Sequence, residues 1–190
     1  MKNILSSILI IAIAFTSFSQ NSNELYVGDK ISDFSASADN STIWNSNEVK
    51  TNFLVVYFYP AAMTGGCTKQ ACAYRDDKAS FDKMGVTVIG ISGDEVENLK
   101  HFKESYQLNF PLLSDVKGTI AKLFGVPTKD GGSITREFNG ESFLLKRGVT
   151  ASRWTFVLDK NQTIIYKNSE VNASEDSKNI QEIIKNFTAN

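Results

Sequence analysis

The sequence predicts an α/β fold built on a central mixed β-sheet with helices on both faces. Segments of continuous β-branched and aromatic residues alternate along the chain with segments whose apolar residues recur at helical spacing. Near the C-terminus two strand-like segments are separated by a short polar turn, which predicts a hairpin and therefore an antiparallel part of the sheet. No repeat, low-complexity tract or linker interrupts this order, so we expect one domain.

The first half of the chain supplies the core strands. Its expected elements are a buried strand over 53–59, a glycine loop over 61–66, a helix over 67–84, a second buried strand over 86–91 and a helix over 95–106. The strands read as buried because FLVVYFY and VTVIGI contain no charged residue. Gly85 is expected to end the first helix. Residues 20–52 are polar and turn-rich, and we assign no element there.

The second half is expected to complete the sheet and its helical cover. The elements are a short strand over 110–113, a helix over 118–124, strands over 154–159 and 163–167, and a final helix over 174–187. The polar segment 129–148 suggests a hairpin that turns at Asn139-Gly140. In the final helix we expect Ser174 to act as the N-cap. Its spacing predicts four inward-facing side chains: Ile180, Ile183, Ile184 and Phe187.

Composition excludes several functional classes. The chain has 190 residues, 42% of them hydrophobic, and a formal net charge of -1. That apolar fraction is enough for a buried core, and the charge balance lacks the basic excess of a nucleic-acid-binding surface. Two cysteines and one histidine cannot form a Cys/His-only zinc site or a disulfide-dense scaffold. We therefore expect no Cys/His zinc site and no nucleic-acid partner.

Residues 1–19 have the pattern of a secretory signal peptide. Lys2 gives a positive start, residues 4–18 are apolar apart from Ser and Thr, and Ser17 and Ser19 are the small residues expected before a cleavage site. The alternative is a membrane anchor, but the apolar run is shorter than the roughly 20 residues that span a bilayer. We expect a mature domain over 20–190, exported to the periplasm or secreted, with no stable membrane insertion after cleavage.

The positions of the two cysteines in the sequence favour a chemical role. Cys67 follows a strand and a glycine loop at the start of a helix, where unpaired N–H groups and the helix dipole stabilise a thiolate. Cys72 lies five residues later, and in one helix the two Cα atoms would be about 8.6 Å apart. A disulfide needs about 4.4–6.8 Å. Either the segment is not helical, or forming the bond unwinds it. Spacing alone leaves a redox pair and a permanent structural disulfide equally open.

The surrounding residues resemble a known family. The stretch FYPAAMTGGCTKQACAYRD, at 58–76, resembles the active-site segment of peroxiredoxins, and within them the Q-type, or bacterioferritin comigratory, subgroup. Its Pro-x-x-x-Thr-x-x-Cys pattern is met by Pro60, Thr64 and Cys67, and Cys72 occupies the position of that subgroup's resolving cysteine. Three further segments match in the right order, GISGD at 90–94, FPLLSD with AKLFGV at 110–126, and RWTFVLD at 153–159.

The resemblance implies a thioredoxin-like fold and a thiol-dependent peroxidase that needs no metal and no organic cofactor. Cys67 would attack hydrogen peroxide or an organic hydroperoxide and become a sulfenic acid, and Cys72 would then form a disulfide with it. Thr64 would hydrogen-bond the thiolate and the peroxide, Arg153 would stabilise the thiolate and the developing charge, and Pro60 would shape and shield the loop.

For its partners, the resemblance implies a thioredoxin-like dithiol as reductant. It favours a monomer, with a weak dimer as the alternative. Two other functions stay open, namely a thioredoxin-like disulfide reductase and a non-enzymatic domain with a structural disulfide. One departure concerns the loop, because Gly65 stands where the subgroup commonly has Pro.

Overall fold

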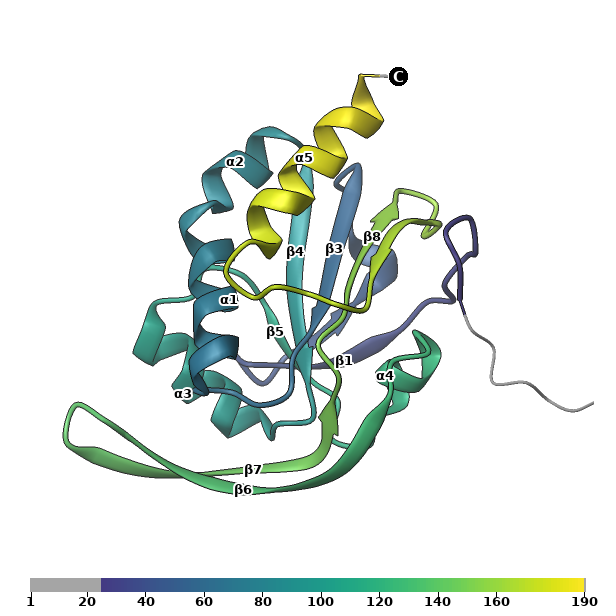
Figure 1. The fold of residues 1–190 in the computed structure, drawn as a ribbon. Helices are drawn as coiled ribbons and strands as arrows, with labels where there is room; N and C mark the ends of the chain where they lie inside the picture. The colour runs from purple at the N-terminus through teal and green to yellow at the C-terminus, as the bar shows by residue number, and fades with distance from the viewer. Residues whose placement is uncertain (1–24, 190) are drawn as a thin grey trace, which may run out of the picture.

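The computed structural model describes residues 25–189 (Figure 1). The predicted signal peptide over 1–19 lies outside the described residues. Seven strands form one sheet in the order β2-β1-β5-β4-β3-β8-β9. Their bounds are β1 Ser35–Ala38, β2 Ile43–Asn45, β3 Phe53–Phe58, β4 Val86–Ser92, β5 Leu112–Ser114, β8 Thr155–Asp159 and β9 Ile164–Asn168. Strand β4 runs parallel to β3 and β5, and the remaining pairs are antiparallel, so the predicted mixed sheet is confirmed.

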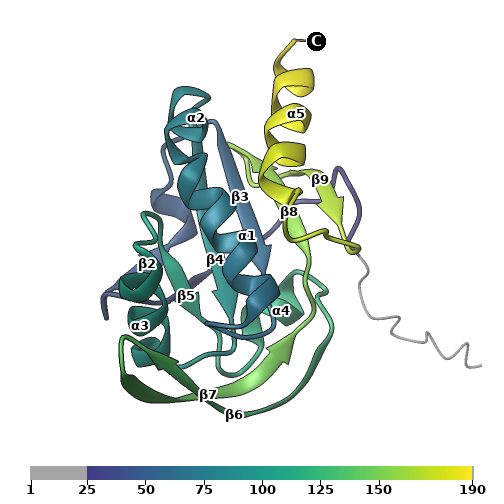
Figure 2. The same ribbon diagram turned by 60° about the vertical axis from the view of Figure 1, so that its left-hand side comes forward.

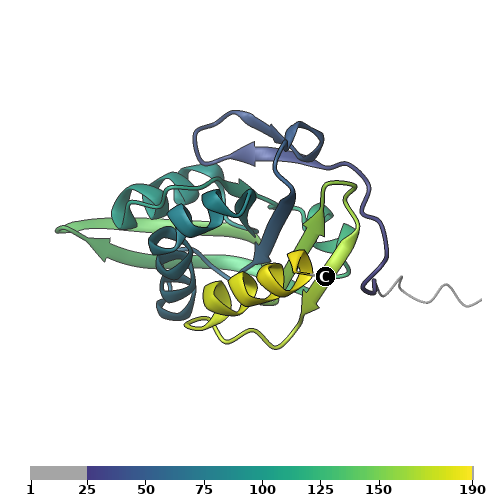
Figure 3. The same ribbon diagram turned by 90° about the horizontal axis from the view of Figure 1, so that it is seen from above.

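Helices cover both faces of this sheet, as predicted. They are α1 Gly65–Asp76, α2 Lys78–Lys83, α3 Val96–Tyr106, α4 Thr119–Leu123 and α5 Asp176–Thr188. Side chains of α1, α2, α3 and α5 share one core cluster with Val55 and Tyr57 of β3. Side chains of α4 share the other with Leu54 and Val56 of the same strand. Strand β3 is thus buried on both faces, which explains its continuous apolar sequence. Figure 3 shows α1 and α5 lying together on one side of the sheet.

The first helix differs from its prediction. The segment expected as one helix over 67–84 is two helices, because the backbone at Asp77 leaves the helical region (φ −89°, ψ 1°). The Asp77 carboxylate accepts a hydrogen bond of 2.6 Å from the hydroxyl of Ser177 on α5. A tertiary contact therefore accompanies the break, and the helical spacing of the sequence continues through it. The helix also begins two residues earlier than expected, at Gly65.

Strands β1 and β2 were not predicted. Residues 20–52 lack an apolar run, and β1 consists of the small residues Ser35, Ala36, Ser37 and Ala38. Its pairing is distant in sequence, with Ser37 opposite Ser114 of β5. Short strands need little intrinsic preference when partner strands supply the hydrogen bonds, so composition alone does not reveal β1 and β2.

The predicted hairpin at Asn139-Gly140 is confirmed and longer than expected. Strands β6 Thr128–Phe138 and β7 Glu141–Ala151 pair along their full length. Asn139 (φ 52°) and Gly140 (φ 82°) both adopt the left-handed conformation that a two-residue hairpin turn requires. The hairpin forms a curved arm that crosses beneath the main sheet and reaches α3 (Figures 1 and 2).

The final helix corrects two predictions. It begins at Asp176, and the Ser174 side chain bonds the Asn172 carboxamide instead of capping a helical N–H. Ile180 and Ile184 are buried as expected, but Phe187 is 50% exposed. The Phe187 ring still meets the edge of Phe53, with centroids 5.9 Å apart. In the part of the chain that the structure describes, no helix is long and apolar enough to cross a bilayer.

Candidate active site

The loop after β3 delivers Cys67 to the start of α1. Thr64 is extended (φ −99°, ψ 151°), and the first helical hydrogen bond joins the Thr68 N–H to the Thr64 carbonyl at 2.8 Å. Cys67 is the third residue of the helix and is 1% exposed. The amides of the first turn, which precede that first helical bond, are therefore free to stabilise an anion. The predicted position of Cys67 at a helix N-terminus is confirmed.

Arg153 lies directly against the Cys67 sulfur. Its Nη2 donates to Sγ of Cys67 at 3.3 Å, although the two residues are far apart in sequence. Gly66 leaves the necessary space, since a Cβ atom there would lie 3.3 Å from the same Nη2. The arrangement places a permanent cation beside the sulfur that the sequence marked as the nucleophile.

Thr64 and Pro60 lie in the loop that leads from β3 to the helix of Cys67. The Thr64 hydroxyl donates to the carbonyl of Ala61 at 2.9 Å, and its side chain makes no bond that caps α1. A hydroxyl has one proton, so donation to a thiolate or a peroxide requires it to rotate away from Ala61. That role for Thr64 stays a prediction. Pro60 is partly buried in the turn between β3 and the helix.

Two residues that the sequence did not mark join the site. Gln70 accepts from Nη1 of Arg153 at 2.5 Å and donates through Nε2 to Oδ2 of Asp176 at 2.7 Å. Gln70 is three residues after Cys67, so helical spacing could have placed it on the same face. Asp176 comes from the first turn of α5, and no sequence pattern connects it with the cysteine.

Cys72 occupies the same helix as Cys67. It is partly buried, both thiols are free, and α1 is continuous across them. The predicted helix between the two cysteines is confirmed, and an intact helix holds their Cα atoms about 8.6 Å apart. Burial raises the pKa of the Cys72 thiol, an effect that nearby Arg75 partly offsets and Asp76 reinforces. Cys72 is therefore a protonated thiol at neutral pH.

A model of the AhpC/TSA family matches residues 27–167. The chain belongs to the AhpC/TSA family. Chloroplastic peroxiredoxin Q of Oryza sativa subsp. japonica is 42% identical over 132 residues, covering 70% of this chain and 52% of that protein. Chloroplastic peroxiredoxin Q of Arabidopsis thaliana is 42% identical over 133 residues, covering 69% and 52%. The chain thus spans about half the length of these relatives. The resemblance to Q-type peroxiredoxins is confirmed.

Solved structures agree with this family. Peroxidoxin BcpB from Mycobacterium tuberculosis matches with a TM-score of 0.71 at 30% identity, covering 85% of this chain and 97% of that one. Peroxiredoxin Q from Xanthomonas campestris matches with a TM-score of 0.66 at 24% identity, covering 80% and 90%. The predicted thioredoxin-like fold is confirmed. Within residues 25–189, no group of three or more His, Cys, Asp and Glu side chains is placed to hold a metal ion.

In this AhpC/TSA chain, the β6–β7 hairpin and the end of β4 hold the active-site loop. The Ala62 N–H donates to Oδ2 of Asp94, which is buried, at 2.8 Å. Nε of Arg136 donates to the Met63 carbonyl at 3.2 Å. Met63 has a positive φ of 56°, which costs energy for a residue with a side chain. These two bonds fix the strained loop directly before Thr64, and they give Arg136 a place that the sequence did not indicate.

Gly65 stands where the Q-type subgroup commonly has proline, and the structure has room for a proline there. It is the first residue of α1, nothing lies within 4 Å of a Cβ built on it, and the preceding Thr64 is extended, as proline requires. We expect Gly65→Pro to raise the free energy of unfolding by about 0.4–1 kcal/mol, because the unfolded chain loses freedom. Urea unfolding measures the change. A decrease would show that the Gly65 N–H is needed in the folded protein.

Asp176 makes stability depend on pH. Burial raises the pKa of its carboxyl, although bonds from Tyr74, Gln70 and Thr155 and the charge of Arg153 partly offset this. The raised pKa contributes stability that is complete below the unfolded value of about 3.9 and is lost as pH rises through the folded value. We therefore expect Asp176→Asn to gain stability relative to the wild type between about pH 3.5 and pH 7.

Urea unfolding of both proteins across that range measures this difference. The exposed Asp130 offers the matched control, since Asp130→Asn removes a carboxylate that is open to solvent. A stability difference between Asp176→Asn and the wild type that stays the same at every pH would contradict the expectation.

Proposed function

We propose that this chain is a thiol-dependent peroxidase that reduces hydrogen peroxide and organic hydroperoxides. The observation that carries the proposal is the 3.3 Å contact between Nη2 of Arg153 and Sγ of Cys67, at a buried helix N-terminus. A cation and free amides around one sulfur can stabilise negative charge on it during the reaction, and a thiolate is the nucleophilic form of cysteine. Membership of the AhpC/TSA family supports the same chemistry.

The reaction has two steps within the chain. The Cys67 thiolate attacks the terminal oxygen of ROOH, the O–O bond breaks, and RO⁻ leaves and takes up a proton to give ROH. Arg153 stabilises the negative charge as it moves to the leaving oxygen. The sulfenic acid on Cys67 then reacts with the Cys72 thiol, forming an S–S bond and releasing water. The peroxide has gained two electrons, one from each cysteine sulfur.

We propose that a thioredoxin-like dithiol restores the two thiols by disulfide exchange. Residues 1–19 would serve as a signal peptide and export the protein to the periplasm or the exterior. The positive start at Lys2 and the apolar stretch over 4–18 support the signal peptide. The named relatives are chloroplastic, which agrees with targeting to a compartment in general. The protein would act as a monomer.

One titration tests the proposed function. The reduced protein is mixed with increasing hydrogen peroxide, and free thiols and intact mass are measured after each addition. We expect one equivalent of peroxide to remove both thiols and to lower the mass by that of two hydrogen atoms. Retention of both thiols after excess peroxide would overturn the proposal. Reduction of insulin disulfides without peroxide consumption would instead indicate a disulfide reductase.

A further inference from the structure

A buried carboxylate on the last helix is connected to the active-site sulfur by a chain of hydrogen bonds. Asp176 is 1% exposed and lies beyond residues 27–167, which match the family. We propose that Asp176 is a positioning residue that holds the guanidinium of Arg153 against Cys67 by fixing the carboxamide of Gln70. This inference rests on the proposed function, because it assigns how the cation of that reaction is oriented.

The carboxylate is itself held firmly. Its Oδ2 accepts from Nε2 of Gln70 at 2.7 Å, from the Tyr74 hydroxyl at 2.8 Å and from the Thr155 hydroxyl at 2.8 Å. The donors come from α1 and β8, which are the helix that carries Cys67 and the strand that follows Arg153. One oxygen atom therefore ties together the two segments whose approach brings the guanidinium to the sulfur.

The direction of donation along these hydrogen bonds determines how the Gln70 carboxamide is oriented. A carboxylate can only accept, so the carboxamide must present its NH₂ group to Asp176. Its Oε1 then points the other way and accepts from Nη1 of Arg153 at 2.5 Å. A guanidinium is planar, so fixing Nη1 also fixes Nη2, which donates to Sγ of Cys67 at 3.3 Å. The carboxylate thus acts on the sulfur through Gln70 and Arg153.

A purely structural role makes a different prediction. If Asp176 only anchored α5, its replacement would change stability, and the effect of any change at Gln70 would be independent of it. Exchanging the positions of the carboxylate and the carboxamide distinguishes the positioning role of Asp176 from a purely structural one. Gln70→Glu alone puts two acceptors face to face. Gln70→Glu with Asp176→Asn keeps the net charge and restores a donor between them.

The experiment uses the full chain with Cys72→Ser, so that only Cys67 reacts. Two rates are measured from about pH 6 to about pH 8.5, namely alkylation of Cys67 by iodoacetamide and its oxidation by hydrogen peroxide. Each rate is divided by that of the reference protein, which carries Cys72→Ser alone. Two adjacent carboxylates share a proton at low pH and repel when both ionise. We therefore expect Gln70→Glu alone to react nearly normally at the lower pH and to fall by about tenfold at the higher one.

The exchanged pair is expected to stay within about threefold of the reference at every pH, because a charge-assisted bond again holds the guanidinium. The other charged or titratable groups that influence Asp176 (Tyr57 of β3, Tyr74 of α1, Tyr166 of β9 and Arg153) are unchanged in all variants. If Gln70→Glu and the exchanged pair show the same rates and the same pH profile, the proposal is overturned.

A second pair keeps the test decisive if Gln70→Glu does not fold. Gln70→Met preserves packing but removes both hydrogen bonds. We expect Asp176→Asn to change the alkylation rate when Gln70 is present and to leave it unchanged beside Gln70→Met. An equal effect in both backgrounds means that Asp176 acts through space, which overturns the proposal. Alkylation needs no peroxide, so a protein that fails to reduce peroxide would refute the proposed function and leave this inference testable.

Discussion

Cys67→Ser is expected to slow hydroperoxide reduction by more than about 10³-fold, because the nucleophile is lost. A serine hydroxyl stays protonated at neutral pH and cannot form a sulfenic acid, so no second route is left in the same site. Cys72→Ser is expected to behave differently. It keeps the helix N-terminus and the contact with Arg153, so its first turnover should be as fast as that of the wild type. It should then stop, because no thiol remains to resolve the sulfenic acid.

Rapid mixing with hydrogen peroxide measures both variants. The wild type should consume peroxide continuously in the presence of a dithiol reductant, and Cys72→Ser should consume one equivalent. Its sulfenic acid is then trapped with dimedone and located by mass spectrometry. Circular dichroism of each reduced variant shows whether it is folded. Continued turnover by Cys67→Ser would refute the assignment of the nucleophile. Failure of Cys72→Ser in the first turnover would mean that Cys72 acts before the sulfenic acid forms.

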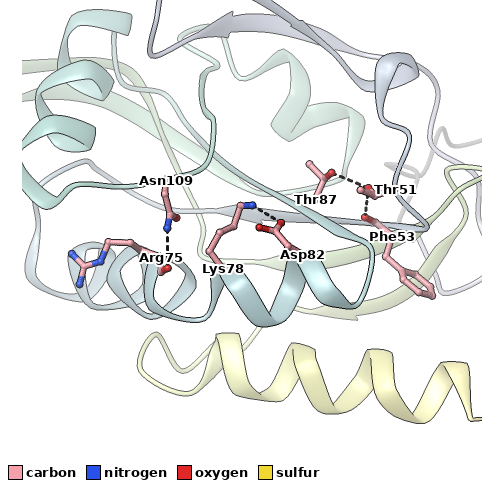
Figure 4. Close-up of polar contacts among 7 residues, drawn as sticks. All are labelled: Thr51, Phe53, Arg75, Lys78, Asp82, Thr87 and Asn109. Atoms are coloured by element: carbon pink, nitrogen blue, oxygen red, sulfur yellow. Dashed lines mark hydrogen bonds and ion pairs between the residues drawn. The ribbon is translucent and has the colours of Figure 1, made fainter.

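The proposed disulfide between Cys67 and Cys72 would require α1 to change over part of its length only. The far end of the helix is tied down, since Nδ2 of Asn109 donates to the Arg75 carbonyl at 3.1 Å and Nη1 of Arg75 donates to the Tyr106 carbonyl at 2.6 Å (Figure 4 shows the first of these). The first turns, which carry both cysteines, contain two exposed glycines, Gly65 and Gly66. Unwinding there would also withdraw Gln70 from Arg153. Formation of the disulfide would thereby disrupt the arrangement of Cys67, Gln70 and Arg153 until a reductant restores the thiols.

The sequence predicted the parts of the site that depend on neighbouring residues. Cys67 could be placed because a buried strand and two glycines precede it. Arg153 could be placed only through the resemblance of RWTFVLD to the family, because its own surroundings favour a surface charge. Asp176 could not, because one aspartate at the start of an amphipathic helix is indistinguishable from an exposed one. Its role depends on Tyr74 and Thr155, which come from two other elements. Long-range contacts of this kind leave no local pattern.

The same limit applies to the fold. Strands β3 and β4 have long apolar sequences because they are buried on both faces, and both were predicted. Strand β1 is built from small residues and depends on pairing with β5, so it was missed. The break at Asp77 is accompanied by a hydrogen bond from Ser177, which is far along the chain. Errors fell where a distant partner, rather than the segment's own composition, determines the conformation.

Arg153→Lys is expected to lower the rate of Cys67 with hydrogen peroxide by about 10²–10³-fold, although the charge is kept. The wild-type guanidinium donates to two groups at once, Sγ of Cys67 at 3.3 Å and Oε1 of Gln70 at 2.5 Å. An ammonium group is a compact point charge without that planar fork, and it cannot reach both. If the ammonium group stays with the Gln70 carboxamide, the charge that develops at the sulfur loses its donor. If it approaches the sulfur, the buried Oε1 of Gln70 loses its donor instead.

The rate is measured in a single turnover with reduced protein, so that reductant and disulfide formation do not contribute. Arg75→Lys is the matched control, since Arg75 contacts the exposed Asp76 at 2.8 Å and stands eight residues after Cys67 in α1. It should leave this first step unchanged. If Arg153→Lys reacts within about threefold of the wild type, a positive charge alone is sufficient at this position. The orientation that Gln70 and Asp176 impose on the guanidinium would then have no part in the chemistry. A lysine has a single nitrogen, so holding it at Gln70 cannot aim a second nitrogen at the Cys67 sulfur.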